Sequence, residues 1–349
     1  MVFAAAWVLF AASGLQGEPK DPAPPPDRKA YASLGELSRA FDDAIQRGAK
    51  EWNEKRLAAL EKYVAAKEPP PDRDEALATA SSVAFSLEKW AVAGQHADRY
   101  LADFPEGKRR PAMAFQSATC LSRLEGKEAE AKAALEKVAQ DYASDSQAVF
   151  NALNSLVELL TGAGNLEGAR GTLDRIAEVI KSQPWAGQYL DVKRKELDLI
   201  GTEPKPIDVK DLDRKPLRLA DLKGKVVLLD FWATWCGPCR VELPNVLSVY
   251  REFHDRGFEI LGVSLDEDEK TLKDFLKEQG MTWPQFFDGK KEVSTLYEVR
   301  AIPATFLLNK EGKIHRVGLR GEAVGRAVEK LLGPAPPAKS PPAGGSRSG

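Results

Sequence analysis

The spacing of apolar residues separates two regions of the chain. From about residue 30 to residue 200, apolar side chains recur every three or four positions among many Ala, Glu and Lys residues, which predicts amphipathic helices. Between residues 202 and 333, short apolar runs alternate with helical segments. Such alternation is typical of a sheet flanked by helices. We therefore predict an all-α domain over residues 30–200 and an α/β domain over residues 202–333.

The helical region carries an internal repeat of 38 residues. Alanine stands at Ala93, Ala131 and Ala169, and the apolar positions that follow keep the same spacing. Gly126 and Gly164 lie in the turns before two of the predicted helices. A fixed period with small residues at contact positions indicates stacked helical hairpins. The pattern resembles tetratricopeptide repeats, whose usual period is about 34. It favours either a concave surface for a protein partner or a helical spacer or dimerisation element.

Runs of β-branched and aromatic residues predict the strands of the second region. Residues 226–232 are apolar except for Asp230, as expected of a strand that is buried on both faces. Gly201 to Pro206 is the predicted boundary between the two regions. The other predicted elements are a hairpin (207–209 and 217–219), a buried strand (258–265), an inserted strand and short helix (282–288 and 293–299), a second hairpin (304–308 and 314–317) and a closing helix (322–332).

The two ends of the chain differ from the regions between them. Residues 2–12 form an apolar run that is too short to span a bilayer, and small residues follow it. Residues 1–17 therefore fit a secretory signal or an apolar N-terminal segment, although no Lys or Arg precedes the run. Residues 18–29 are Pro-rich and charged and predict a linker, whereas residues 334–349 are rich in Pro, Gly and Ser and predict a disordered tail.

Composition excludes several classes of function. The 349 residues carry a net charge of −2, so no nucleic-acid partner is expected. Three cysteines are too few for a disulfide-stapled scaffold. Cys120 lies among apolar residues of the helical region and is predicted to be a buried core residue. The other two, Cys236 and Cys239, stand three positions apart.

The pair Cys236 and Cys239 stands where a predicted strand passes into a predicted helix. Pro238 fits the first helical turn, which does not need its missing N–H. A helix N-terminus favours the thiolate, which is the nucleophile of disulfide exchange. We therefore predict a redox-active disulfide, with Cys236 as the exposed, low-pKa thiol and Cys239 as the buried one. Half of a zinc site is the alternative, but the remaining Cys and the three His form no second paired cluster, so no metal and no other cofactor is expected.

The same stretch resembles a known family. Residues 230–239 read DFWATWCGPC, which is similar to the thioredoxin motif. Arg240, Glu242 and Pro244 follow, as in the extracytoplasmic thioredoxin-like reductases of the TlpA/ResA type. The resemblance covers about residues 202–332 and implies an α/β thioredoxin-like domain with a central mixed sheet. The helical region lies outside it.

The resemblance also implies roles for two carboxylates. Asp230 matches the buried Asp of thioredoxin, which is proposed to serve the second cysteine, and Glu242 matches a Glu that tunes the site in ResA-like proteins. A carboxyl group in an apolar strand has a raised pKa and can exchange a proton near neutral pH. The structural alternatives are a hydrogen-bonded Asp230 and a Glu242 that is a solvated charge on its helix.

An apolar rim is expected around the two sulfur atoms. Ile302 and Pro303 resemble the cis-proline loop of thioredoxin folds, which faces the cysteines and whose backbone pairs with the substrate chain. An apolar rim docks protein chains rather than small polar molecules. Trp232 is assigned either to this rim or to the core. The other rim residues are Trp235, Gly237, Pro238, Ile302 and Pro303.

The leading functional prediction is an exported, periplasmic or otherwise extracytoplasmic protein-disulfide reductase, membrane-associated if its N-terminus is uncleaved. Its partners are substrate protein disulfides and a membrane or soluble thiol electron donor. A peroxiredoxin-like peroxidase is one alternative, but that family has Thr and Pro where this chain has Ala233 and Leu229. A helical-repeat binding module with an accessory thioredoxin fold is the other. The sequence leaves the substrate and the direction of electron flow open.

Overall fold

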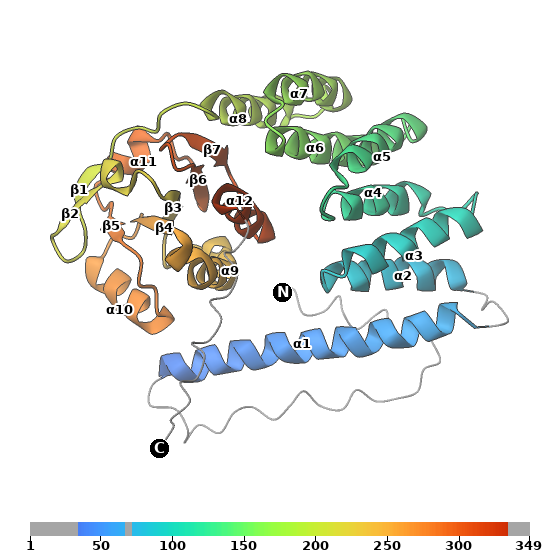
Figure 1. The fold of residues 1–349 in the computed structure, drawn as a ribbon, viewed down its shortest axis with the longest axis horizontal. Helices are drawn as coiled ribbons and strands as arrows, with labels where there is room; N and C mark the ends of the chain where they lie inside the picture. Colours follow the sequence, from blue (N-terminus) through green and yellow to red (C-terminus); the bar gives the residue numbers. More distant parts are fainter. Residues whose placement is uncertain (1–33, 67–71, 334–349) are drawn as a thin grey trace, which may run out of the picture.

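The computed structural model describes residues 34–66 and 72–333 (Figure 1). The predicted signal segment, linker and tail lie outside the described residues. The N-terminal region is helical throughout its described part and the α/β region follows it, as predicted. Its helices are α1 (Leu34–Val64), α2 (Arg73–Ser86), α3 (Trp90–Asp103), α4 (Arg110–Leu121), α5 (Glu128–Asp141), α6 (Ser146–Gly162), α7 (Leu166–Ile180) and α8 (Ala186–Leu199).

The 38-residue repeat corresponds to helical hairpins. Helices α2 and α3, α4 and α5, and α6 and α7 pack in pairs. Ala93, Ala131 and Ala169 are each the fourth residue of the second helix of a pair, and all three are fully buried. A small side chain at this position lets neighbouring helices approach closely, so the prediction of stacked hairpins is confirmed.

The turn within each hairpin uses a left-handed residue. Gly126 and Gly164 have φ of 73° and 76°, a conformation that glycine adopts without a steric penalty. The equivalent position of the first hairpin holds Glu88, which has φ of 60°. The first turn therefore has the same shape as the other two without their glycine.

The α/β region contains a mixed sheet in the strand order β5-β4-β3-β6-β7. Strand β3 is parallel to β4 and antiparallel to β6. A small separate sheet pairs β1 (Asp208–Lys210) with β2 (Pro216–Arg218). The strands of the main sheet are β3 (Val226–Trp232), β4 (Phe258–Ser264), β5 (Gln285–Phe287), β6 (Ala304–Leu308) and β7 (Ile314–Val317). The helices are α9 (Gly237–Phe253), α10 (Glu269–Gln279), α11 (Glu292–Leu296) and α12 (Glu322–Leu332), with the short 3-10 helices η2 (Leu219–Leu222) and η3 (His254–Arg256).

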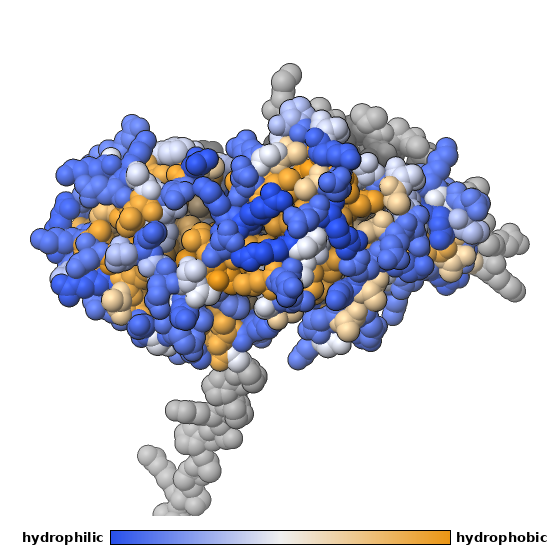
Figure 2. All heavy atoms as spheres, turned by 90° about the horizontal axis from the view of Figure 1, so that it is seen from above, coloured by the Kyte–Doolittle hydropathy of each residue, from blue (hydrophilic) through white to orange (hydrophobic). Residues whose placement is uncertain are grey.

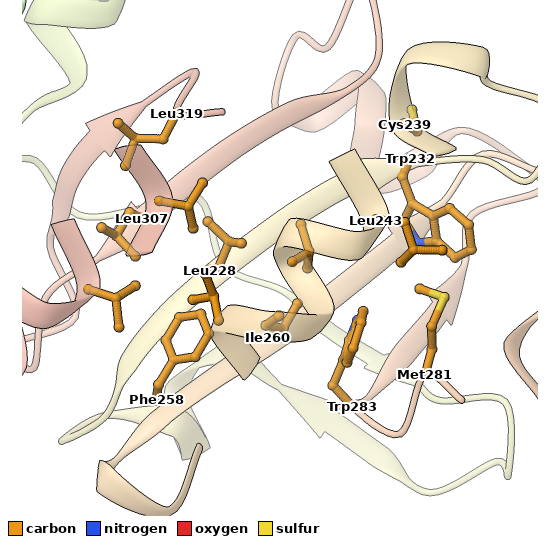
Figure 3. Close-up of a cluster of buried hydrophobic side chains, with 14 of the residues drawn as sticks. Leu228, Trp232, Cys239, Leu243, Phe258, Ile260, Met281, Trp283, Leu307 and Leu319 are labelled. Atoms are coloured by element: carbon orange, nitrogen blue, oxygen red, sulfur yellow. The ribbon is translucent and has the colours of Figure 1, made fainter. Parts of the chain in front are cut away.

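Both faces of β3 are buried, as its apolar sequence predicts. Leu228 and Trp232 pack into the cluster drawn in Figure 3, together with α9 and α12. Leu229 and Phe231 belong to the cluster on the opposite face of the sheet. Because side chains alternate along a strand, Asp230 shares the face of Leu228 and Trp232. The one carboxylate of this strand therefore points toward the helix that carries the two cysteines.

Contacts join the helical region to the last elements of the α/β region. The amide N–H of Gly201 donates to the carbonyl of Ile314 (2.7 Å), and the N–H of Ile314 donates to the carbonyl of Thr202 (2.9 Å). These two bonds extend the sheet beyond β7 with the first residues after α8. The first two residues of the predicted boundary, Gly201 and Thr202, therefore bond to the edge of the sheet.

Helix α12 contacts the hairpins at both of its ends. Lys330, near its C-terminus, donates to the carbonyl of Gly162 at the end of α6 (2.7 Å). Burial and the nearby carboxylate of Glu88 raise the pKa of Glu322, the first residue of α12, and Arg123, which follows α4, also lies near it. On the neighbouring strand β7, the nearly buried Arg316 pairs with Glu158 of α6 (2.5 Å). The hairpins are thus fixed against α12 and β7 by polar contacts.

The surface carries both polar and apolar areas. Figure 2 shows one face, on which hydrophilic residues surround smaller apolar patches. Within residues 34–66 and 72–333, no helix is long and apolar enough to cross a membrane.

Candidate active site

Cys236 is the N-cap residue of α9, as the strand-to-helix prediction required. Its sulfur accepts a hydrogen bond from the N–H of Cys239 (3.2 Å), and a disulfide joins the two residues. Both cysteines are nearly buried, with exposed fractions of 4% and 6%. The predicted contrast between an exposed Cys236 and a buried Cys239 is therefore absent from this disulfide-bonded form. Neighbouring walls of the site cover both sulfur atoms.

The wall opposite the disulfide is the loop before β6. The Ile302-Pro303 peptide bond is cis. The carbonyl oxygen of Ile302 lies 3.7 Å from the sulfur of Cys236. Ile302 is half-buried and Pro303 is buried. The backbone of this loop therefore directly faces the reactive sulfur, as the resemblance to thioredoxin folds implied.

The exposed part of the rim is formed by residues around the start of α9. Trp235 is 65% exposed, and Gly237 and Pro238 are exposed as well. Val241 is 79% exposed and lies one helical turn beyond Pro238, so it continues the apolar surface. The apolar spacing along this helix groups Val241 with Leu243 and Val246, both of which are buried, so the spacing alone predicts the wrong side of the helix for Val241.

Of the two predicted places for Trp232, the rim and the core, the structure shows the core. Its exposed fraction is 4%, and its indole N–H donates to the side chain of Gln285 (3.1 Å). The indole also packs against the ring of Phe275 from α10. As the last residue of β3, Trp232 points into the space between the sheet and its helices (Figure 3).

Asp230 is buried behind the disulfide. In the described part of the chain, no group donates a hydrogen bond to its carboxyl. Burial, together with the negative charge of Glu242, raises the pKa of Asp230 from 3.8 to about 7. The alternative of a hydrogen-bonded structural Asp is therefore not what the structure shows. A carboxyl group with this pKa exchanges protons near neutral pH.

A second buried carboxylate, Asp266, differs from Asp230 because it accepts several hydrogen bonds. Asp266 is 2% exposed and accepts hydrogen bonds from the hydroxyls of Thr234 (2.6 Å) and Ser264 (2.7 Å). It also accepts the backbone N–H of Thr234, in the loop between β3 and α9 (3.1 Å). Asp266 therefore anchors the loop that leads to Cys236, whereas Asp230 anchors nothing.

Glu242 is half-buried on α9 and has a specific partner. Its carboxylate accepts a hydrogen bond from the N–H of Gly321 (2.7 Å). Glu242 is thus held in place rather than solvated. The partner comes from the loop between β7 and α12, which sequence reasoning did not connect with the site.

A small cavity connects the two carboxylates with the buried cysteine. Its volume is about 20 Å³, which is enough for about one water molecule. Its lining includes Asp230, Cys239, Glu242, Thr305 and Arg320. Among residues 34–66 and 72–333, no group of three or more His, Cys, Asp or Glu side chains is placed to hold a metal ion. The arrangement therefore combines a disulfide, a nearby buried carboxyl group with a raised pKa and an apolar rim.

Comparison with known proteins finds relatives that are thiol-disulfide oxidoreductases. The model of the AhpC/TSA family matches residues 200–317. The thiol-disulfide oxidoreductase ResA of Bacillus subtilis is 38% identical over 117 residues, which are 34% of this chain and 65% of the relative. ResA of Bacillus cereus is 38% identical over 139 residues, 40% of this chain and 73% of the relative.

Among solved structures, the thioredoxin domain of a thiol-disulfide oxidoreductase from Bacteroides vulgatus is 36% identical, with a TM-score of 0.36, and the match covers 38% of this chain and 98% of that one. The matched family model leaves out the helical hairpins and α12. Because a 38% identical ResA matches over 73% of its length, this chain belongs to the ResA-type thiol-disulfide oxidoreductases.

Proposed function

We propose that the chain is an extracytoplasmic protein-disulfide reductase that works through Cys236 and Cys239. The observation that carries the proposal is the position of the disulfide, at the start of α9 and 3.7 Å from the Ile302 carbonyl. A helix N-terminus stabilises a thiolate, and the facing loop offers its backbone to a polypeptide. The exposed Trp235 and Pro238 supply the apolar surface on which a protein docks.

The reaction is a two-electron exchange through a mixed disulfide. In the reduced protein, the Cys236 thiolate attacks one sulfur of the substrate disulfide, and the other substrate sulfur leaves as a thiolate. The Cys239 thiolate then attacks the Cys236 sulfur and releases the second substrate thiol. The substrate gains two electrons and the enzyme forms the Cys236–Cys239 disulfide. A membrane or soluble thiol donor must then reduce this disulfide before the next turnover.

Asp230 is the proposed proton acceptor for Cys239. Cys239 attacks only after it loses its thiol proton, and it lines the same cavity as Asp230. Because the pKa of Asp230 is about 7, its carboxylate can take up that proton at neutral pH. Glu242 supports this role, because its charge contributes to the raised pKa of Asp230.

The helical hairpins offer a surface for a protein partner.

The test is reduction of a protein disulfide, such as that of insulin, by the full chain with a thiol donor. We expect Cys236→Ser to abolish reduction and Cys239→Ser to accumulate a mixed disulfide with the substrate. Cys120→Ser is the matched control and should retain full activity, because Cys120 is buried in the helical region. Unchanged reduction by Cys236→Ser, or activity only in the consumption of peroxide, would refute the proposal.

A further inference from the structure

One loop is bonded to both walls of the active site. Residues 319–321, here called the clamp loop, connect β7 with α12 and lie beyond the residues matched by the family model. On the α9 side, the N–H of Gly321 donates to Glu242 (2.7 Å), and its carbonyl accepts from the side chain of Asn245 (2.8 Å). On the side of β6, the carbonyl of Leu319 accepts from the hydroxyl of Thr305 (2.8 Å).

Arg320 makes the remaining contact of the clamp loop. Its guanidinium donates to the carbonyl oxygen of Pro303 (3.0 Å). Proline has no N–H, so this carbonyl is the only backbone group through which Pro303 can be hydrogen-bonded. Pairing of β6 with β3 starts at Ala304, which lies opposite Phe231. Arg320 therefore fixes the position of Pro303, which directly precedes the first residue of β6 that pairs with β3.

The residue on the other side of Pro303 is available to a ligand. In the described part of the chain, no group accepts a hydrogen bond from the N–H of Ile302. Its carbonyl lies beside the sulfur of Cys236. A donor and an acceptor of one residue, next to the reactive sulfur, are what an extended polypeptide needs to pair its backbone. The orientation of Ile302 depends on how Pro303 is held.

We propose that Arg320 is a positioning residue for polypeptide substrates. It holds the Ile302-Pro303 loop in the orientation in which the backbone of Ile302 pairs with the chain that carries the substrate disulfide. This inference rests on the proposed function. A small aromatic disulfide has no backbone to pair and needs only access to Cys236, so the orientation of Ile302 contributes nothing to its binding.

The experiment compares the full chain with Arg320→Ala on two substrates, insulin and a small aromatic disulfide. We expect Arg320→Ala to raise KM for insulin roughly ten-fold, the effect of losing one charged hydrogen bond, with kcat nearly unchanged. Its rate with the small disulfide should fall much less than its rate with insulin. Arg320→Lys should restore part of the loss, because an ammonium group can also donate to a carbonyl.

Arg300→Ala is the matched control. Arg300 is exposed, precedes the same loop and carries the same charge, and it makes no hydrogen bond to the described residues. It should behave as the unmodified chain does with both substrates. Equal losses by Arg320→Ala on both substrates, or no loss on either, would overturn the inference, and the Lys variant separates these outcomes from misfolding. Failure of the proposed function is distinguishable, because the unmodified chain would then not reduce insulin.

Discussion

Replacing Asp230 with Asn should stabilise the protein at alkaline pH. The carboxyl of Asp230 is buried without a hydrogen bond from the described residues, and its pKa is about 7 in the folded protein against 3.8 ordinarily. Between these two pH values the folded protein binds the proton more tightly than the unfolded chain does. The stability of the folded protein therefore falls as pH rises from about 4 to about 7. Above pH 7 Asp230 is ionised, and the loss of stability that it causes stays at its full size.

The size of the effect follows from the two pKa values. A change from 3.8 to about 7 corresponds to about 4 kcal/mol of lost stability once Asp230 is ionised. Asn removes this cost, but its amide must also be buried without a partner, which costs roughly 1–3 kcal/mol. We therefore expect Asp230→Asn to be more stable than the unmodified protein by roughly 1–3 kcal/mol at pH 8. It should show little advantage at pH 4.

The assay is guanidinium unfolding of the disulfide-bonded proteins at both pH values, followed by tryptophan fluorescence. Asp266→Asn is the control, because Asp266 accepts several hydrogen bonds and should lose stability when it becomes an amide. The same Asp230 variant should resolve the mixed disulfide more slowly. Loss of stability at pH 8, or an unchanged pH dependence, would show that the Asp230 carboxylate is compensated in the folded state.

Two further predictions concern the helical region and its junction with the sheet. Gly126→Ala should destabilise the protein by about 1 kcal/mol, because Gly126 has a left-handed φ of 73° and an added Cβ would meet no neighbouring atom. Thermal melts measure this loss, and an unchanged melting temperature would contradict the strain argument. A fragment that starts at Leu199 should fold and reduce insulin. A fragment that starts at Glu203 should be less stable, because it lacks the two hydrogen bonds to Ile314. Urea unfolding compares the two fragments, and equal midpoints would contradict the importance of these bonds.

The elements that sequence reasoning located best are those with strong local signals. Strand β3 begins and ends at the predicted residues, because a long apolar run follows a turn and precedes the cysteine motif. The closing helix α12 also has its predicted bounds, since Gly321 and Gly333 flank an amphipathic segment. Asp230 stood out as the one charged residue in an apolar strand, and burial is what gives it a distinctive pKa.

The parts that sequence reasoning missed depend on contacts between distant segments. Arg320 and Gly321 reach the site from about eighty positions beyond the cysteines, and no periodicity marks a loop residue that bonds to a carbonyl. Trp232 was ambiguous, because core and rim residues of a strand end have the same composition. The pair of Arg316 and Glu158 joins residues 158 positions apart, and each alone reads as an ordinary charged residue.

The two ends of α12 lie against different hairpins, and this arrangement constrains how many hairpins the helical region can contain. Helix α12 has 11 residues, which is about 16 Å of helix. Its start lies beside the turn of the first hairpin, at Glu88, and Lys330 near its end bonds to the third hairpin, at Gly162. Solenoids usually tolerate the gain or loss of a repeat, because each repeat contacts only its neighbours. Here one added or deleted hairpin would move either the turn at Glu88 or Gly162 away from α12, so a change in the number of hairpins would also change the contacts of the α/β region.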